Sequence, residues 1–234
     1  MKTPLEVKTA PKVRIRPQVG VFGRIPRAGA VKTRLARQHD PEWVAGLYRA
    51  FLADTLERCA EVAAGDLWLF LAPGETEASE TFIPLVPVER TRLQEGDTLG
   101  ERIERALDVM LEKGPALVVG SDAPDLPISH LEDALRALPD CDLVLGPTAD
   151  GGYYLIGARA PLGNLLDGIA WSTSSVFEET CARAAARGWK VRVLASWQDV
   201  DEPSDLEALR ERLGRAIAAG EGVPPRTAEW LKDS

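Results

Sequence analysis

Residues 19–35 read VGVFGRIPRAGAVKTRL and are the most informative segment of this 234-residue chain. An apolar run at 19–22 leads into a loop broken by Gly and Pro, which we call the basic loop (Gly23–Arg34), and then into a helical pattern. The loop carries four cations: Arg24, Arg27, Lys32 and Arg34. A strand, a flexible cationic loop and a helix N-terminus in this order favour phosphate binding, because backbone N–H groups and the helix dipole add to the side-chain charge.

Basic residues gather at the start of a chain that is acidic as a whole. Residues 1–37 hold ten Lys and Arg and one acidic residue, a balance of +9, whereas the whole chain has a formal net charge of −8. Residues 38–234 therefore sum to −17. Cations collected in one place on an acidic protein indicate a local anionic ligand and argue against a nucleic-acid-binding surface.

Cysteine usage and hydropathy limit the class of protein. Cys59, Cys141 and Cys181 are far apart and form neither a disulfide framework nor a zinc-binding spacing, so we expect buried thiols in a reducing cytoplasm. No stretch of the sequence is apolar for long enough to span a bilayer. These features favour a cytoplasmic protein.

Apolar runs alternate with amphipathic stretches along the chain. Strands are expected at 18–23, 66–72, 116–121, 142–146, 152–157 and 190–195. Helices are expected at 41–63, 98–113, 128–138, 174–187 and 203–218. This alternation is typical of a single α/β domain with a Rossmann-like, mainly parallel sheet. Only about four residues separate the strands at 142–146 and 152–157, too few for a parallel crossover, so at least one strand should run antiparallel and make the sheet mixed.

Polar turns follow four of these strands. Ligands of such sheets lie beyond the carboxyl ends of the strands. The basic loop follows the first strand, and acidic turns follow three others: Ser121–Leu126, Gly146–Gly152 and Asp199–Leu206. One cationic and three acidic turns should therefore meet at one edge of the sheet. Carboxylates beside bound phosphates normally have a divalent cation between them, and Mg²⁺ suits oxygen ligands together with phosphate.

Each turn also has a purely structural interpretation. Asp122 can begin a turn, Asp201 can cap the helix that follows it, and Asp150 before two glycines is a turn signal. The basic loop can be a solvated helix start, and Gln94–Arg102 is interpreted as a loop and helix start in preference to a segment that recognises a base or sugar. The coincidence of the polar turns at strand carboxyl ends favours function for the set.

Six motifs in this order resemble a bacterial family of A-type glycosyltransferase-like proteins. They are RAGAVKTRL (27–35), QEGDTLGER (94–102), GSDAPDL (120–126), GPTADGGYYLIG (146–157), WST (171–173) and DVDEPSDL (199–206). The resemblance covers residues 18–210 and implies the nucleotide-diphospho-sugar transferase fold of the A-type glycosyltransferases. The KTRL and SDAP elements also resemble those of 2-phospholactate guanylyltransferase and, more remotely, molybdenum cofactor guanylyltransferase.

The resemblance and the positions of the turns assign a role to each residue that we single out. On the nucleotide side we expect Gly23, Arg24, Gly29, Lys32, Thr33, Arg34 and Ser121. On the acceptor side we expect Gly151, Gly152, Tyr153, Trp171, Ser172 and Thr173. Lys32, Arg34 and Asp150 are the expected catalytic residues. The resemblance implies that Asp122, completed by Asp201, holds a metal ion, either Mg²⁺ or Mn²⁺.

These expectations describe a metal-dependent transferase that uses a nucleotide. We favour nucleotidyl transfer from an NTP to a small phosphate-bearing acceptor. Glycosyl transfer from a nucleotide sugar is the first alternative, and a non-catalytic nucleotide-binding module is the second. The expected partners are a nucleotide and a small-molecule acceptor, with no nucleic acid and no membrane span, and the sequence leaves a homodimer open. We expect a polar basic leader at 1–17, a nucleotide-binding transferase domain at 18–219 and a C-terminal tail, loose or folded as a short packing helix, at 220–234.

Overall fold

The computed structural model describes residues 16–63, 66–73 and 86–232, and the predicted leader lies outside these ranges except for its last two residues. Within them the strands are β1 (Gln18–Gly23), β2 (Leu67–Leu71), β3 (Thr91–Leu93), β4 (Ala116–Gly120), β5 (Leu143–Pro147), β6 (Tyr153–Ala158) and β7 (Val191–Val193). The α-helices are α1 (Pro41–Ala63), α2 (Leu99–Leu111), α3 (Ile128–Ala137), α4 (Val176–Ala186), α5 (Pro203–Ala218) and α6 (Pro225–Lys232). Short 3₁₀ helices cover Leu35–Arg37, Val88–Arg90 and Leu138–Asp140.

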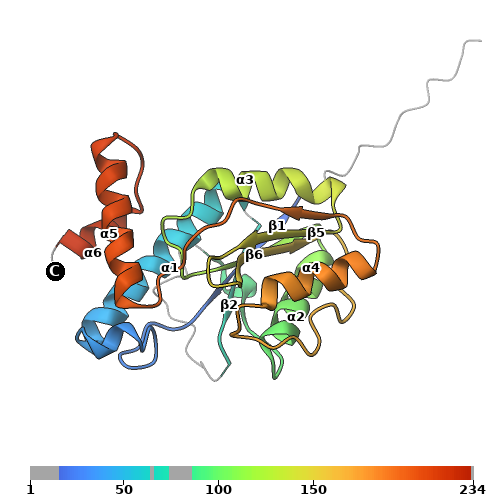
Figure 1. Cartoon of the computed structure of the whole chain (residues 1–234), viewed down its shortest axis with the longest axis horizontal. Coiled ribbons are helices and arrows are strands. Elements are labelled where there is room, and N and C mark those ends of the chain that lie inside the picture. The colour runs from blue at the N-terminus through green and yellow to red at the C-terminus, as the bar shows by residue number, and fades with distance from the viewer. Residues whose placement is uncertain (1–15, 64–65, 74–85, 233–234) are drawn as a thin grey trace, which may run out of the picture.

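The strands form one sheet in the order β3-β2-β1-β4-β6-β5-β7, at the centre of the molecule (Figure 1). β6 runs antiparallel to both of its neighbours, β4 and β5, and the other paired strands are parallel. The predicted mixed, mainly parallel sheet is therefore confirmed. Since β6 is reversed, its first residue, Tyr153, pairs with Pro147 and lies at the edge where the parallel strands end.

Two hydrophobic cores lie on the two faces of the sheet. On one face Leu52 and Leu56 of α1 and Leu131 of α3 pack with the strand residues Val19 and Leu117. On the other face residues of α2 and α4 pack on side chains of β2, β4 and β5, among them Trp68, Phe70, Ile103, Met110, Val118, Leu145 and Val176. Strands covered on both faces explain the nearly continuous apolar runs of β2 and β4. None of the helices in the described part of the chain is long and apolar enough to cross a membrane.

A third cluster anchors the basic loop at one end of the molecule, where α5 and α6 lie together (Figure 1). Val31 and Leu35 pack there against α1, α5 and α6, with Phe51, Leu209 and Ala228 among the buried partners. The buried carboxylate of Asp54 on α1 accepts hydrogen bonds from the backbone N–H groups of Arg226 (3.2 Å) and Thr227 (2.7 Å), in the first turn of α6. Of the two alternatives for the stretch after Gly220, the structure has the packed helix.

Two local expectations from the sequence are wrong. The basic loop does not open directly into a long helix: it leads into the 3₁₀ turn Leu35–Arg37, and α1 begins only at Pro41. The Oδ1 atom of Asp40 accepts hydrogen bonds from the N–H groups of Glu42 and Trp43, and Pro suits the first helical position, so the sequence around Asp40 starts the helix there. The N-terminus of α1 is therefore separated from the basic loop along the chain by residues 35–40. The edge strand β3 was not expected, because its sequence TRL has one apolar residue and forms no apolar run.

Candidate functional site

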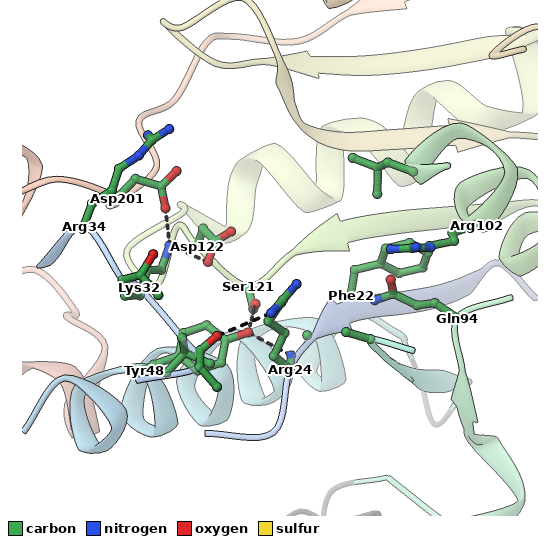
Figure 2. A pocket seen from close by; sticks show the side chains of 16 residues that line it. Phe22, Arg24, Lys32, Arg34, Tyr48, Gln94, Arg102, Ser121, Asp122 and Asp201 are labelled. Carbon is green, nitrogen blue, oxygen red and sulfur yellow. Dashed lines mark hydrogen bonds and ion pairs between the residues drawn. The ribbon is translucent and has the colours of Figure 1, made fainter. Parts of the chain in front are cut away.

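The basic loop and the ends of β1 and β4 enclose a cavity of about 560 Å³, the first cavity (Figure 2). It lies at the carboxyl-end edge of the sheet, as the strand-end argument predicts. The residues expected from the sequence that line it are Gly23, Arg24, Lys32, Thr33, Arg34, Ser121, Asp122 and Asp201. The structure adds Phe22, Ala30, Val31, Tyr48, Ala72, Gln94, Leu99 and Arg102.

Lys32 joins the two carboxylates that were predicted to hold a metal ion. Its Nζ lies 2.6 Å from Oδ1 of Asp122 and 2.6 Å from Oδ1 of Asp201, as Figure 2 shows. The Lys32 side chain is only 5% exposed, whereas those of Asp122 and Asp201 are 46% and 41% exposed. Burial alone would lower the pKa of the Lys32 ammonium, but the charges and hydrogen bonds of the two carboxylates outweigh it and raise that pKa.

Asp201 does not cap helix α5, although the sequence also allowed that structural role. The N-cap of α5 is Glu202, which forms a capping box with Asp205, and the Asp205 carboxylate accepts from the backbone N–H groups of both Asp201 and Glu202. The Asp201 side chain therefore caps nothing and turns to Lys32. The backbone of Asp122 is tied to the same segment, because its carbonyl accepts from Val200 N–H at 2.9 Å.

Tyr48, on α1, connects the ends of β1 and β4. Its hydroxyl accepts a hydrogen bond from Arg24 N–H at 3.0 Å and shares another with Ser121 Oγ at 2.8 Å. Burial, and then the negative charge of Asp122, raise the pKa of Tyr48 to about 12, so the phenol keeps its proton. The sequence analysis did not identify this residue, because a tyrosine among the buried residues of a long helix has the pattern of a core residue.

At the far end of the first cavity, one side is apolar and the other is polar. Figure 2 shows Phe22, Gln94 and Arg102 together, away from Lys32. Gln94 Nε2 donates to the Phe70 carbonyl at 3.0 Å, which orients the side-chain amide, and Arg102 Nε donates to the Gly96 carbonyl at 2.9 Å. The segment Gln94–Arg102 is thus a loop and helix start, as expected, and it also lines the cavity.

A second cavity of about 300 Å³ adjoins the first, and Phe22, Leu99 and Asp122 line both. Of the residues expected around catalysis and the acceptor, it is lined by Asp150, Gly152, Tyr153, Trp171, Ser172 and Thr173. Among the described residues that line it there is no Lys, Arg or His. The phosphate-bearing acceptor expected from the sequence would therefore meet no basic side chain in this lining.

Asp150 shapes the turn beside the second cavity. Its Oδ1 accepts hydrogen bonds from Gly152 N–H at 3.1 Å and from the Thr148 hydroxyl. Gly151 has φ +90°, and a Cβ there would overlap the backbone of Ser174, so glycine allows the 172–175 segment to approach. Gly151 and Gly29 line neither cavity, in contrast to the other residues predicted for binding.

Asp199 also lines the second cavity; it belongs to the expected acidic turn Asp199–Leu206 but was assigned no role of its own. Burial, followed by the negative charges of Asp201 and Asp150, raises its pKa to about 6. With Asp122 and Asp150 it brings three carboxylates to one small space. Clusters of this kind are common at functional sites.

The chemistry of Asp122 and Asp201 fits a divalent cation that is completed by a substrate. Both Oδ1 atoms converge on one cationic centre, the Lys32 ammonium. The described residues contain no group of three or more His, Cys, Asp or Glu side chains that could hold a metal ion by themselves. Mg²⁺ is usually bound by one or two carboxylates together with phosphate oxygens and water, so two carboxylates beside a phosphate site suffice.

Comparison with solved structures places the fold. A provisionally assigned nucleotide-diphospho-sugar transferase from Desulfovibrio desulfuricans G20 is 32% identical, with a TM-score of 0.83 over 93% of this chain and 94% of its own. The inositol-1-phosphate CTP transferase of T. maritima is 14% identical (TM-score 0.59; 89% and 98% covered), and a cytidylyltransferase of Leptospira borgpetersenii is 13% identical (TM-score 0.53; 94% of each chain). The chain has the nucleotide-diphospho-sugar transferase fold, with two cavities at the carboxyl ends of its strands.

Residues 55–173 match a family model described as "Uncharacterized protein conserved in bacteria (DUF2064)". Together with the 32% identity over nearly the whole length of the Desulfovibrio protein, this match shows that the chain belongs to the DUF2064 family. A search of curated proteins finds no match to the chain.

Proposed function

We propose that the protein is a metal-dependent transferase that moves a nucleotidyl group from an NTP to a small acceptor. The observation that carries this proposal is the pair of adjoining cavities that share Asp122, one lined by cations and the other by carboxylates and hydroxyls. The relative that is 32% identical, provisionally assigned as a nucleotide-diphospho-sugar transferase, and the CTP transferase that shares the fold support a nucleotide substrate.

In this proposal the first cavity binds the nucleotide. The phosphates lie beside Arg24, Thr33 and Arg34, where charge-assisted hydrogen bonds hold them. The base lies at the other end, against Phe22, Gln94 and Arg102. Gln94 Nε2 donates one of its two N–H groups to the Phe70 carbonyl, which leaves the second N–H and the amide oxygen for the base.

The reaction takes place where the two cavities meet. A hydroxyl oxygen of the acceptor attacks the α-phosphorus, a P–O bond forms, and the bond to pyrophosphate breaks with its electron pair leaving on pyrophosphate. Asp150 accepts the hydroxyl proton, and Arg34 stabilises the negative charge of the phosphates; Lys32 would add its charge once its two carboxylates hold a metal ion. Asp122 and Asp201 are the carboxylates that would hold Mg²⁺ or Mn²⁺, which when bound supplies positive charge to the phosphate oxygens.

Glycosyl transfer from a nucleotide sugar is a second candidate. It is favoured by the second cavity, which is small, has carboxylates on its rim and no described basic side chain, and adjoins the predicted phosphate site. In that reaction the cavity would hold the sugar of the donor, and a nucleoside diphosphate would leave.

Calorimetric titration of nucleotides, with and without Mg²⁺, tests the proposal. We expect NTPs to bind more tightly with Mg²⁺, and Asp122→Asn to remove this gain while the protein stays folded, because Asn keeps the size of Asp without its charge. Asp133→Asn, an exposed carboxylate on α3 paired with Arg136, is the matched control and should behave as the wild type. Pyrophosphate release from NTPs supports nucleotidyl transfer, and turnover of nucleotide sugars alone supports the second candidate. No nucleotide binding by the wild type would refute both.

A further inference from the structure

The second cavity differs in chemistry from the first. Its inner wall is apolar and aromatic: Tyr153 and Trp171 meet edge to face with ring centroids 6.1 Å apart, and Ile103, Val118, Ile156 and Val176 complete it. Its rim is polar, with the carboxylates of Asp122, Asp150 and Asp199 and the hydroxyls of Thr148, Ser172 and Thr173. An apolar wall with a few convergent polar groups is the usual composition of a small-molecule site.

The charges of this cavity oppose an anionic ligand. Three carboxylates line it, and the described part of the lining has no basic side chain to balance them. Lys32 is the cation next to Asp122, but its ammonium is already paired with Asp122 and Asp201. A phosphate group adds nearly two negative charges at neutral pH, so it would be repelled here.

The N-terminus of α4 does not supply an anion site either. α4 begins at Val176, which lines the cavity, but Phe177 N–H already donates to the Gly151 carbonyl at 2.8 Å. Glu178 and Glu179 occupy the first turn, where acidic side chains already offset the partial positive charge of the helix end.

A ligand with hydroxyl groups and an apolar C–H face matches the carboxylates and aromatic rings that line the second cavity. Carboxylates accept hydrogen bonds from hydroxyl donors, and aromatic side chains pack against apolar faces of a ligand. The Trp171 ring lines the cavity and supplies part of this aromatic surface. A cavity of about 300 Å³ limits the occupant to a small molecule or a single ring.

We propose that the second cavity binds an uncharged, hydroxyl-bearing group with an apolar face and selects against its phosphate ester. This rests on the proposed function only in that the group reacts with a nucleotide held in the first cavity. It replaces the phosphate-bearing acceptor expected from the sequence. Under either reaction the same chemistry applies, since the occupant is the acceptor in nucleotidyl transfer and the donor's sugar in glycosyl transfer.

Ligand-observed NMR with matched pairs of probes tests the inference. The probes are glucose with glucose 1-phosphate and glycerol with glycerol 3-phosphate, each added to the protein with ATP and Mg²⁺, for wild type and for Trp171→Ala. We expect the uncharged member of at least one pair to bind at least tenfold more tightly than its ester, and this binding to be lost in Trp171→Ala. We expect Asp199→Asn to reduce the difference in affinity between the uncharged probe and its phosphate ester, because one negative charge that repels the ester is removed.

Two results would overturn the inference: esters that bind equally well or better in a Trp171-dependent way, or no Trp171-dependent binding of any probe. Trp171→Phe, which keeps a ring, and circular dichroism show whether the alanine variant has folded. The ATP signal in the same samples is an independent readout of the first cavity. If the wild type binds neither ATP nor any other NTP, the proposed function is refuted, whereas a wrong probe preference with the nucleotide still bound refutes only this inference.

Discussion

Lys32 is a buried ammonium in a backbone conformation that residues with a side chain rarely adopt. Its φ is +45°, in the left-handed region, and its side chain extends between Asp122 and Asp201. Strained residues of this kind persist where the surroundings hold them, and they are frequent at functional sites. The two ion pairs hold its side chain, and its carbonyl accepts a hydrogen bond from Ala36 N–H at 3.2 Å.

Lys32→Met should destabilise the protein by about 1–2 kcal/mol, because two neighbouring carboxylates lose their shared cation while staying partly solvated. We expect Mg²⁺ to raise the melting temperature of this variant more than that of the wild type, since the cation can then bind the carboxylates without competing with Lys32. Thermal unfolding with and without 10 mM Mg²⁺, a roughly saturating amount for a weak site, measures both effects.

Arg34→Met is the matched control for this experiment. Arg34 lies in the same loop, is 59% exposed and approaches Glu202 only at 3.6 Å. Its loss should leave the melting temperature almost unchanged and weaken nucleotide binding instead. Equal Mg²⁺ responses of Lys32→Met and the wild type would argue against a cation site at Asp122 and Asp201.

The sequence predicted the charged residues of the site better than its supporting residues. Asp122, Asp201 and Lys32 stand in turns, where the interruption of an apolar pattern is visible and the end of a strand gives the location. Tyr48 acts through its hydroxyl alone and is otherwise packed like its neighbours, and Gln94 was interpreted only as part of a loop and helix start. The pairing of Lys32 with both carboxylates joins three distant segments, and only the folded chain reveals it.

At the scale of elements, the two turns that carry Asp122 and Asp201 share one support. Asp125 lies in the first turn and is almost fully buried; its Oδ2 accepts from Arg212 Nε of α5 at 2.6 Å. Trp197 Nε1 donates to Asp125 Oδ1 at 3.3 Å, and Arg212 Nη1 donates to Gln198 at 2.6 Å. Arg212 thus ties both turns to the same helix.

Arg212→Met should cost about 3 kcal/mol of folding stability, because it leaves the buried Asp125 carboxylate without its cation. We also expect weaker Mg²⁺-dependent nucleotide binding, as the two turns lose their common attachment. Urea unfolding and calorimetry measure the two effects. Arg215→Met, one turn further along α5 at an exposed i,i+4 pair with Glu211, should change neither. Unaltered binding in a folded Arg212→Met protein would show that the network serves stability alone.

Gly46→Ala tests the packing of α6 on α1. A Cβ at Gly46 would overlap the Trp230 ring, so we expect a net loss of about 1–3 kcal/mol although alanine is the better helix former. Gly214→Ala in α5 is the control: a Cβ there meets nothing within 4 Å, so it should stabilise the protein by about 0.5–1 kcal/mol. Urea unfolding of both variants gives the comparison, and a stable Gly46→Ala protein would mean that α6 docks loosely.

The predicted elements differ from those observed mainly where tertiary contacts determine whether a segment forms a helix or strand. Strand β1 and helices α1 and α5 have the predicted bounds because caps and apolar patterns mark their ends locally. Strand β3 exists only because the edge of β2 offers it hydrogen bonds. Whether the stretch after Gly220 is loose or packs as a helix depends on its contacts with Asp54 and Gly46 of α1. No pattern within that stretch can show these contacts.

At the scale of the whole molecule, a buried thiol and a buried phenol should make the folding stability fall at alkaline pH. Burial raises the pKa of the Cys59 thiol from 9.0 to about 12, and that of Tyr48 from 10.0 to about 12. At a pH between the unfolded and the folded pKa, the unfolded chain releases protons that the folded chain keeps. The contribution of these two groups to folding stability is therefore fully present below pH 9 and is lost as the pH rises towards 12. Each group contributes a slope of up to about 1.4 kcal/mol per pH unit.

Cys59→Ala should reduce this loss between pH 9 and 10, where the thiol but not the phenol titrates in the unfolded chain. Urea unfolding at several pH values measures the slope, and Tyr48→Phe should act mainly above pH 10. The small cavity of Cys59→Ala lowers stability equally at every pH and leaves the slope interpretable. Identical slopes for wild type and Cys59→Ala would contradict the assignment. Of the expected buried thiols, Cys59 and Cys141 are buried, whereas Cys181 is partly exposed.

The third cluster has a consequence for the order in which the molecule assembles. Val31 and Leu35 are buried partly against Leu209 and Ala228, which are synthesised long after them. During translation the sheet can begin to pair while the basic loop still lacks its contacts with α5 and α6, and such distant contacts form late in folding. A ribosome-bound chain ending before α5 should therefore be structured yet unable to retain a nucleotide, so binding competence would appear only in the last stage of synthesis.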